Sequence, residues 1–405
     1  MAMIEGHRAI APPKGVAVWD VDPYDPAILA NPVEYYAELR RRGPLVFIPR
    51  YAILACGRYE VTKEVFSDHQ RFVSSRGVGL TDFSLETPWR PPSIILEVDP
   101  PDHGKTRRVM ARVMSPGAVA RLRATFEAKA EALVDRLLAK REVEAVAEIA
   151  EAFSVAAFPP AVGLRNIDQR ALVDYGAMVF NALGPDNALR RNAMAKAPNI
   201  VPWITEQCQR TNLHAEGFGA EIYAAADAGD LTEQEAGLLV RSLLSAGVDT
   251  TVTGIGSALW AFAQNPAQFE RLRADPKLAR NAFEEALRLT SPVHTFCRTT
   301  AANTAVAGVE LEEGSKILCV LGAANLDPQQ WENPDSFDIG RRTVGHLAFG
   351  VGIHACVGQN IARAEGEALF TAIAKKVRSI TPAGAAVWRP NNAIHALDRL
   401  PLTLH

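Results

Sequence analysis

Residues 346–365 read HLAFGVGIHACVGQNIARAE, and this stretch decides how the whole chain is interpreted. Three glycines, Gly350, Gly352 and Gly358, bracket Cys356, and a helical pattern begins directly after the last of them. Glycine lets a backbone turn tightly beside a bulky flat group, while amide N–H groups and a helix N-terminus stabilise a thiolate. The pattern suits a cysteine that ligates a metal, although an isolated cysteine is more often a buried small side chain beside a turn.

Nine residues of this stretch fall at the spacings of one known cofactor-binding loop: Phe349, Gly350, Gly352, His354, Cys356, Gly358, Ala362, Arg363 and Glu365. The stretch resembles the haem-binding loop of the cytochrome P450 family. This resemblance implies haem b with Cys356 as its axial thiolate ligand, and Phe349, Gly350, His354 and Gly358 beside the cofactor. It also implies a mainly α fold with small β-sheets, in which residues 1–405 form one large domain around a buried haem.

Two further sets of residues agree with the resemblance. Glu285 and Arg288 in EEALRLTSP form an E-x-x-R pair one helical turn apart, and Arg341 follows in PDSFDIGR. Such a pair alone is usually a solvated ion pair, but the family joins these three residues in a structural cluster. His103, Arg107, Arg298 and His354 match the residues that hold the two haem propionates, although each one singly is more often a surface residue.

The segment SAGVDTT resembles the oxygen-activation motif of the same family. A buried carboxylate or hydroxyl without hydrogen-bond partners costs free energy, so Asp249 and Thr250 in an apolar stretch are expected to have a specific role. By resemblance, Thr250 holds activated oxygen and a water chain, Asp249 relays protons, and Ala246 and Gly247 lie against haem, where Gly247 lets the helix open. The residues alone also allow a threonine bonded to its own helix and an aspartate that faces solvent.

The resemblance assigns a distal pocket to four segments of the chain. Its expected lining is Arg90, Ser93, Ile95, Leu96, Phe180, Leu183, Arg241, Ser242, Ser245, Ala246, Val293 and Phe296. At about 100° per residue, Ser242, Ser245, Ala246 and Asp249 share one helix face. A pocket with an apolar, aromatic part beside serines and arginines suits a flat hydrophobic molecule that carries a carboxylate. The alternative is that Arg90 and Arg241 simply face solvent.

Nearly the full chain looks like the bacterial monooxygenases that oxidise para-substituted benzoic acids, including 4-methoxybenzoate O-demethylases. This resemblance implies that one atom of O2 enters a C–H bond near the para position, and that a methoxy substrate yields a phenol and formaldehyde. Leu183 departs from the aromatic residue expected at its position. Three alternatives stay open: a hydroxylase of a neutral terpene-like substrate, a haem-thiolate peroxygenase or sensor that does not turn over O2, and a helical binding protein without haem.

Composition limits the partners. The 405 residues carry 43 basic and 46 acidic side chains, and this near-neutral balance argues against a nucleic-acid or anionic-membrane footprint. The N-terminus lacks a secretory signal and no apolar run is long enough to span a membrane, so a cytoplasmic protein is expected. The five cysteines never form CxxC, which makes a disulfide framework or a structural zinc site improbable.

The chain also lacks a GxGxxG after a predicted strand, so electrons are expected from a partner. By resemblance that partner is a 2Fe–2S ferredoxin served by an NAD(P)H-dependent reductase. Lys105, Arg108, Arg112 and Arg363 are candidates for a basic docking face on the cysteine side, although each is equally a plain surface residue.

Periodicity and punctuation predict the elements. They favour a helix in PVEYYAELRRRG, residues 32–43, a hairpin from PLVFIPR and YAILACGR, and a proline-rich binding loop over 79–101. Helices then dominate to about residue 285, and the longest begins at a capping box of Thr232 and Glu235 and can run to Asn265. Short strands follow Pro292 and helix returns after Gly358, so one mainly helical domain with small sheets is favoured.

Overall fold

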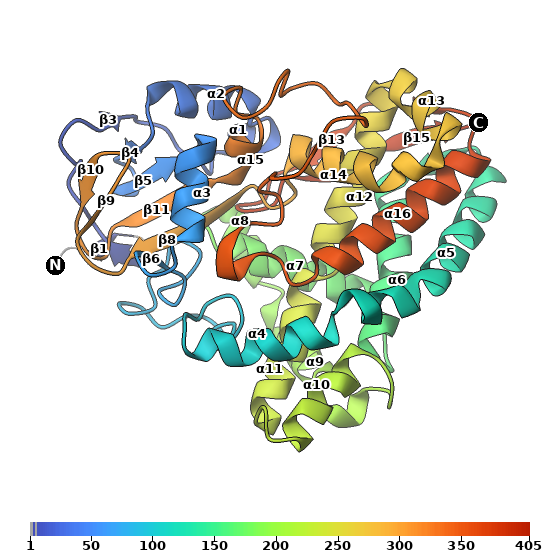
Figure 1. Ribbon diagram of the computed structural model, residues 1–405, viewed down its shortest axis with the longest axis horizontal. Helices are drawn as coiled ribbons and strands as arrows, with labels where there is room; N and C mark the ends of the chain where they lie inside the picture. Colours follow the sequence, from blue (N-terminus) through green and yellow to red (C-terminus); the bar gives the residue numbers. More distant parts are fainter. Residues whose placement is uncertain (1–2, 5) are drawn as a thin grey trace.

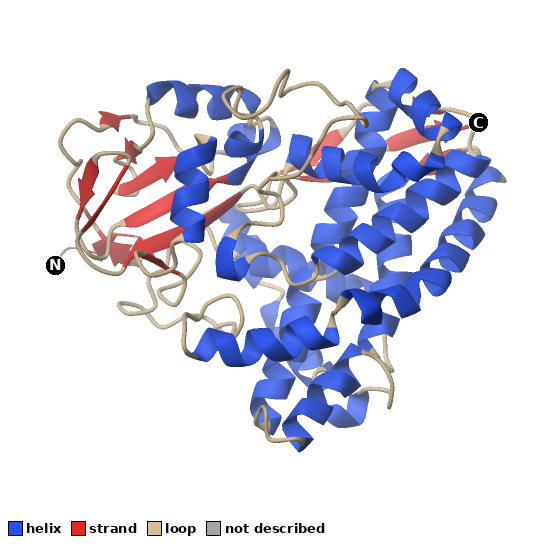
Figure 2. Ribbon diagram, in the orientation of Figure 1, coloured by secondary structure: helices blue, strands red, loops and turns tan. Residues whose placement is uncertain are grey.

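The computed structural model describes residues 3–4 and 6–405, and it confirms the mainly helical class with small sheets (Figure 2). The largest group of strands lies at the N-terminal side of the molecule, and helices with a few short strands form the side that carries the C-terminus (Figure 1). The α-helices are α1 Pro26–Ala30, α2 Val33–Arg42, α3 Tyr59–Ser67, α4 Asp102–Val113, α5 Pro116–Leu138, α6 Ala152–Val162, α7 Gln169–Asn181, α8 Ala188–Met194, α9 Ala197–Gln207, α10 Phe218–Asp227, α11 Glu233–Ala246, α12 Asp249–Gln264, α13 Pro266–Ala274, α14 Ala279–Thr290, α15 Leu321–Asn325 and α16 Gln359–Lys376. A π-helix, η1 Val146–Glu151, leads into α6.

The main sheet has six strands in the order β3-β4-β5-β11-β8-β6. They are β3 Ala17–Val18, β4 Val46–Ile48, β5 Ile53–Cys56, β6 Phe72–Val73, β8 Thr295–Thr300 and β11 Lys316–Val320. The predicted hairpin is confirmed, because β4 and β5 pair antiparallel with Phe47 opposite Leu54. The central strand β11 runs parallel to β5 and antiparallel to β8, so it joins the N-terminal hairpin to the segment that follows α14.

Smaller sheets complete the strand set. The remaining strands are β1 Met3–Ile4, β2 His7–Arg8, β7 Glu142–Glu144, β9 Thr304–Val306, β10 Val309–Leu311, β12 Ile380–Pro382, β13 Val387–Arg389, β14 Ala396–Arg399 and β15 Pro401–Leu404. The strands after Pro292 were expected, but the C-terminal pairings β13–β14 and β12–β15–β7 were not. Each of these strands has only three or four residues, too short for alternation to distinguish it from a loop.

The predicted long helix is correct at both ends and wrong in its middle. Thr232 and Glu235 form the expected capping box, and the helical stretch ends before Pro266. Between these ends the chain breaks into α11 and α12 at Gly247 and Val248. The Thr250 hydroxyl donates to the Ala246 carbonyl at 2.6 Å, a back-bond that bends helices.

The helical half packs around α12, which runs through its interior (Figure 1). C-terminal helix α16 lies against α5 and α14, although α5 is more than 200 residues away in sequence (Figure 1). Phe262 on α12 contacts Phe269, Phe337 and Phe370, so aromatic side chains from four segments meet in one core. By length and composition Glu233–Gln264 alone among the described helices could span a membrane, but 61% of its apolar window is buried inside the protein, as in a core helix.

Candidate functional site

The cysteine loop, residues 346–358, folds as a tight turn between the half of the molecule that contains the six-stranded sheet and α16. Gly350 and Gly352 have φ of +66° and +76°, and a Cβ at Gly352 would lie 2.9 Å from the Phe66 carbonyl oxygen. A side chain at Gly352 would therefore be both strained and crowded. The Cys356 amide donates to the Phe349 carbonyl at 2.8 Å, which closes the turn and places the cysteine just before α16 begins.

Cys356 lines a large internal cavity of about 1650 Å³. Of the residues predicted for the distal pocket, the cavity brings together Arg90, Ser93, Ile95, Leu96, Phe180, Leu183, Ser242, Ser245, Ala246, Val293 and Phe296. It also brings together Arg107, Gly247, Arg298, Phe349, Gly350, His354, Cys356 and Gly358 from the predicted cofactor set. Segments separated by more than 250 residues thus share one space.

The residues around the cysteine end fit a dianionic flat cofactor. Arg298 is buried under the Phe66 ring and its guanidinium donates only to the adjacent Cys297 carbonyl. Arg107 donates to the Ala355 carbonyl, and in the described part of the chain neither arginine makes an ion pair. His103 lies outside the lining, but its ring is 4.5 Å from that of His354, and His103 Nε2 and His354 Nδ1 are buried without hydrogen-bond partners.

Such unpartnered buried donors and cations are costly, and two carboxylates of a bound group would satisfy them. Burial, followed by the nearby His354 and Arg107 charges, lowers the pKa of His103 to about 4, so it is neutral at pH 7. His354 Nε2 lies 3.6 Å from Asp99, and the pKa of Asp99 is low because the nearby His354 and the hydrogen bonds from the Ser74 and Ser75 amides outweigh its burial. The residues present therefore fit haem, and haem bound here would place iron at Cys356.

Burial raises the pKa of the Cys356 thiol. Amide hydrogen bonds from Gly358 and Gln359, and the charges of Arg107 and Arg363, act in the opposite direction. A metal cation deprotonates a coordinating thiol outright, so a ligated iron would overcome the cost of burial.

Asp249 departs from its expected place. The break at Gly247 ends the shared helix face, so Ser242, Ser245, Ala246 and Thr250 line the large cavity while Asp249 does not. Asp249 instead lines a separate cavity of about 350 Å³ and pairs with Arg389 on β13 at 3.1 Å. The carboxylate is buried rather than exposed to solvent, so both readings of its position from sequence were wrong.

Polar groups gather at the end of the large cavity formed by α11 and the 90–97 loop. Ser93 Oγ lies 3.4 Å from Ser242 Oγ, and the Ser93 amide donates to Glu97 at 2.7 Å. Arg90 neither faces solvent nor carries a free charge, because it pairs with the buried Glu97 at 3.0 Å. Arg241 does not line the cavity; it donates to the Pro91 and Pro92 carbonyls behind this wall.

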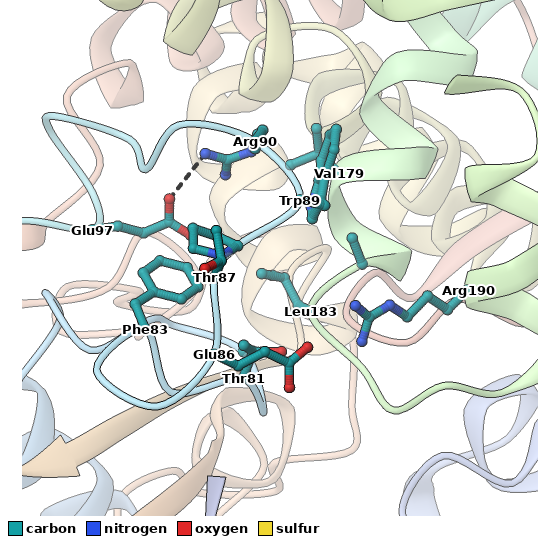
Figure 3. Close-up of a pocket in the computed structure, with 13 residues that line it drawn as sticks. Thr81, Phe83, Glu86, Thr87, Trp89, Arg90, Glu97, Val179, Leu183 and Arg190 are labelled. Atoms are coloured by element: carbon teal, nitrogen blue, oxygen red, sulfur yellow. Dashed lines mark hydrogen bonds and ion pairs between the residues drawn. The ribbon is translucent and has the colours of Figure 1, made fainter. Parts of the chain in front are cut away.

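A second pocket of about 470 Å³ lies on the outer side of the same loop (Figure 3). The dashed line in Figure 3 marks the Arg90–Glu97 pair on one side, and the Arg190 side chain reaches toward the pocket from another side. Leu183 and Arg90 line both this pocket and the large cavity, so they form part of the wall between the two spaces.

Outside the cavity, the structure joins the predicted Glu285, Arg288 and Arg341. Glu285 and Arg288 are fully buried and 2.7 Å apart, and Arg341 reaches the same carboxylate at 2.9 Å. Three of the four expected basic docking residues already form ion pairs within the protein. Lys105 pairs with Glu235, Arg112 with Asp230, and Arg363 with Glu284, which leaves Arg108 as the member without an ion pair in the described part of the chain.

Sequence reasoning missed three partners of site residues. Glu97 neutralises Arg90, Arg389 holds Asp249, and Glu151 faces the small Asp249 cavity. Only Glu97 had a local signal, since it follows Ser93 by four residues and caps the Ser93 amide. Arg389 lies 140 residues from Asp249 in sequence, and no local sequence pattern predicts that contact.

The profile of the family described as Cytochrome P450 matches residues 172–393. Cytochrome p450 CYP199A2 of Rhodopseudomonas palustris is 48% identical over 391 residues, which covers 96% of this chain and 95% of that protein. Beta-dihydromenaquinone-9 omega-hydroxylase of Mycobacterium tuberculosis is 30% identical over 394 residues, with 96% of this chain and 79% of that protein covered. The crystal structure of P450BioI in complex with hexadec-9Z-enoic acid ligated acyl carrier protein has a TM-score of 0.84 at 25% identity, covering 94% of this chain and 100% of that chain.

Proposed function

The chain belongs to the cytochrome P450 family and is a haem-thiolate monooxygenase, and from this premise we propose that its substrate is a small aromatic carboxylic acid such as a para-substituted benzoate. The observation that carries the proposal is the charge at the polar end of the large cavity. Arg90 and Arg241 supply two positive charges there, whereas Glu97 supplies one negative charge. Burial, followed by the repulsion from Arg90, lowers the pKa of Arg241.

A substrate carboxylate would balance this excess charge and accept hydrogen bonds from the hydroxyls of Ser93 and Ser242. Arg241 does not contact the substrate in this proposal. It holds the Pro91 and Pro92 carbonyls by hydrogen bonds, and its positive charge favours an anion at this end of the cavity. The middle of the cavity is apolar and aromatic, with Phe180, Leu183, Val293 and Phe296 on its walls. A flat acid anchored at the serines would direct its para substituent away from them, toward the Cys356 end.

Haem, which Cys356 would hold together with Arg107 and Arg298, would supply the chemistry that splits O2, inserts one oxygen atom into a C–H bond and reduces the other to water. The chain's own residues orient the acid, exclude water and deliver protons. Thr250 lies on the cavity wall and passes a proton into the cavity, while Asp249 relays protons toward it from the far side of the helix break. A 4-methoxybenzoate would leave as a phenol and formaldehyde.

Electrons for this reaction come from a partner in our proposal, a 2Fe–2S ferredoxin with its NAD(P)H-dependent reductase. Of the four predicted docking residues, Arg108 is the exposed one without an ion pair in the described part of the chain, so a single salt-sensitive contact is expected there. We propose further that residues 1–405 act as one domain in the cytoplasm.

The test is a titration of the purified haem protein with 4-methoxybenzoic acid and its methyl ester, followed by the haem spin-state change in the absorbance spectrum. The acid should bind far more tightly than the ester, because only the acid balances the charge excess. Arg241→Met should weaken acid binding by about 10-fold and leave the ester unchanged.

Arg190→Met is the matched control, because Arg190 lines the outer pocket and donates to the Gly184 carbonyl, whereas Arg241 donates to the Pro91 and Pro92 carbonyls at the polar end of the large cavity. An ester that binds as well as the acid would reject the acid assignment in favour of a neutral substrate.

A further inference from the structure

Lys316 is a buried lysine that the monooxygenase reaction does not use. It begins β11, the central strand of the six-stranded sheet, and is 1% exposed. Its ammonium group lies within hydrogen-bond distance of four backbone carbonyls, those of Arg76 at 3.3 Å, Gly77 at 3.4 Å, Gly79 at 3.0 Å and Thr81 at 3.0 Å. Burial lowers the pKa of Lys316 to about 8, so the group remains charged at pH 7.

A buried charge is costly unless oriented dipoles or counter-charges surround it. Four convergent carbonyls provide such a set of dipoles, in the manner in which carbonyl oxygens replace the hydration shell of a monovalent cation. Asp82 adds a negative charge nearby, but it is already joined to Arg76 by hydrogen bonds of 2.9 and 3.1 Å. The loop 76–81 is therefore wrapped around an ammonium group that belongs to a distant strand.

The same loop forms walls of both cavities. Val78 lines the large cavity, while Gly79 and Thr81 line the outer pocket shown in Figure 3. The Leu80 amide donates to the Leu183 carbonyl at 2.9 Å, and a Cβ at Gly79 would lie 2.5 Å from that oxygen. The loop thus contacts Leu183, two residues past the end of α7, and Leu183 lines both spaces, so a change in the loop reaches the substrate wall directly.

We propose that the Lys316 ammonium is an internal cation that sets the conformation of the loop 76–81 and thereby positions the substrate-facing wall formed by Val78 and Leu183. Lys316 is a positioning residue, because it lines neither cavity. The effect on substrate rests on the proposed function, whereas the effect on the loop does not.

The experiment compares wild-type holoenzyme with Lys316→Ala by hydrogen exchange over residues 74–84. Loss of charge-assisted hydrogen bonds should raise exchange in this segment by about 10-fold or more, while the core helices exchange as before. Alanine removes Cγ, Cδ, Cε and Nζ, which n-propylammonium replaces atom for atom. Added n-propylammonium should restore slow exchange, and neutral n-propanol or sodium chloride should not.

Lys14→Ala, at an exposed lysine, is the matched control and should change nothing. Lys316→Met fills the same volume without charge, so it should fold, show fast loop exchange and resist rescue. The proposal would be overturned by unchanged exchange in either Lys316 variant or by equal rescue with n-propanol. It would also be overturned if the Lys316→Met protein failed to fold, because Lys316 would then be needed for the core as a whole and not for the loop.

A second readout concerns the substrate. In Lys316→Ala the spin-state affinity for 4-methoxybenzoic acid should fall by about 10-fold and return with n-propylammonium. A wild-type protein that responds to no benzoic acid would reject the substrate class alone, since the hydrogen-exchange result decides the role of Lys316 independently. Fast loop exchange with unchanged affinity for the acid would overturn the link between the loop and the substrate wall.

Discussion

Asp249 and Thr250 are neighbours in sequence but face different cavities. Thr250 lines the large cavity that contains Cys356, and Asp249 lies 3.1 Å from Arg389 in the small cavity. Burial raises the pKa of Glu151, which lines that small cavity together with Asp249. Asp249 and Thr250 therefore lie side by side in the chain between the small cavity and the large cavity.

Thr250→Ala tests the donor on the large-cavity side. Without its hydroxyl, proton delivery into the cavity should slow, so NAD(P)H consumption should continue while product per NAD(P)H falls by about 10-fold. Product and hydrogen peroxide are measured together in the reconstituted system.

Thr253→Ala is the control for this substitution. Thr253 also donates to a carbonyl one turn earlier, at 2.7 Å, but it lines the small cavity. Equal coupling in wild type and Thr250→Ala would remove Thr250 from the proton route.

The break between α11 and α12 shows how one element produces the separation of these cavities. An unbroken helix would place Asp249 on the face of Ser242 and Ser245. Phe158 on α6 fills the space beside Gly247, where a Cβ would lie 2.1 Å from its ring. The glycine therefore allows a close contact between helices as well as the break itself.

Gly247→Ala should force Phe158 or α12 to move. Overpacking of this kind costs about 1–3 kcal/mol, and a lowered midpoint in thermal unfolding with a changed haem spin state should report it. Gly256→Ala in the same helix is the matched control, because a Cβ there meets only Leu397 at 3.8 Å and alanine favours helix. Equal stability of the two variants would contradict the crowding at Gly247.

A pair of helices at the cysteine side is joined by one carboxylate. Glu284 on α14 bonds His346 at 2.6 Å and Arg363 on α16, and these partners outweigh its burial and lower its pKa to about 2. A lowered native pKa stabilises the fold above the unfolded value of 4.5, and this stabilisation is lost as pH falls toward 2.

Unfolding midpoints between pH 5 and pH 3 should therefore fall more steeply in wild type than in Glu284→Gln, as about 1 kcal/mol or more is lost over that range. Glu221→Gln, which removes a surface pair with Arg121, should keep the wild-type slope. Parallel wild-type and Glu284→Gln curves would show that this carboxylate is not a source of acid sensitivity.

At the scale of the molecule, buried charges add to hydrophobic packing in joining distant parts of the chain. Glu285 and Arg288 on α14 receive Arg341 from the segment before the cysteine loop, and Arg288 also donates to the Asn325 and Pro334 carbonyls. One buried cluster thus fixes the approach of the cysteine loop to the helical half.

Glu285→Gln should leave two buried guanidinium groups short of a counter-charge and cost about 3–5 kcal/mol. The yield of haem-loaded protein and its thiolate-type carbon monoxide spectrum should both fall. Asp230→Asn removes an exposed pair with Arg112 and should cost less than about 1 kcal/mol. A Glu285→Gln protein with wild-type stability would refute this role of the cluster.

The sequence by itself determined the features that repeat at short range or depend on a fixed spacing. The capping box at Thr232, the hairpin, the helix after Gly358 and the turn around Cys356 follow from local chemistry, and the structure contains all of them. The predicted lining of the large cavity also came from residues matched segment by segment to a family, and Arg241 is the member that lies behind the wall instead.

Only the tertiary structure decided which charges are free. Glu97 neutralises Arg90, Arg389 turns Asp249 away from the large cavity, and Lys316 organises a loop more than 230 residues earlier. A side chain's type and neighbours fix what it can bind, but its partner depends on which distant segments the core brings within hydrogen-bond distance. Periodicity carries no record of those contacts, because they are made across the packed core rather than along the chain.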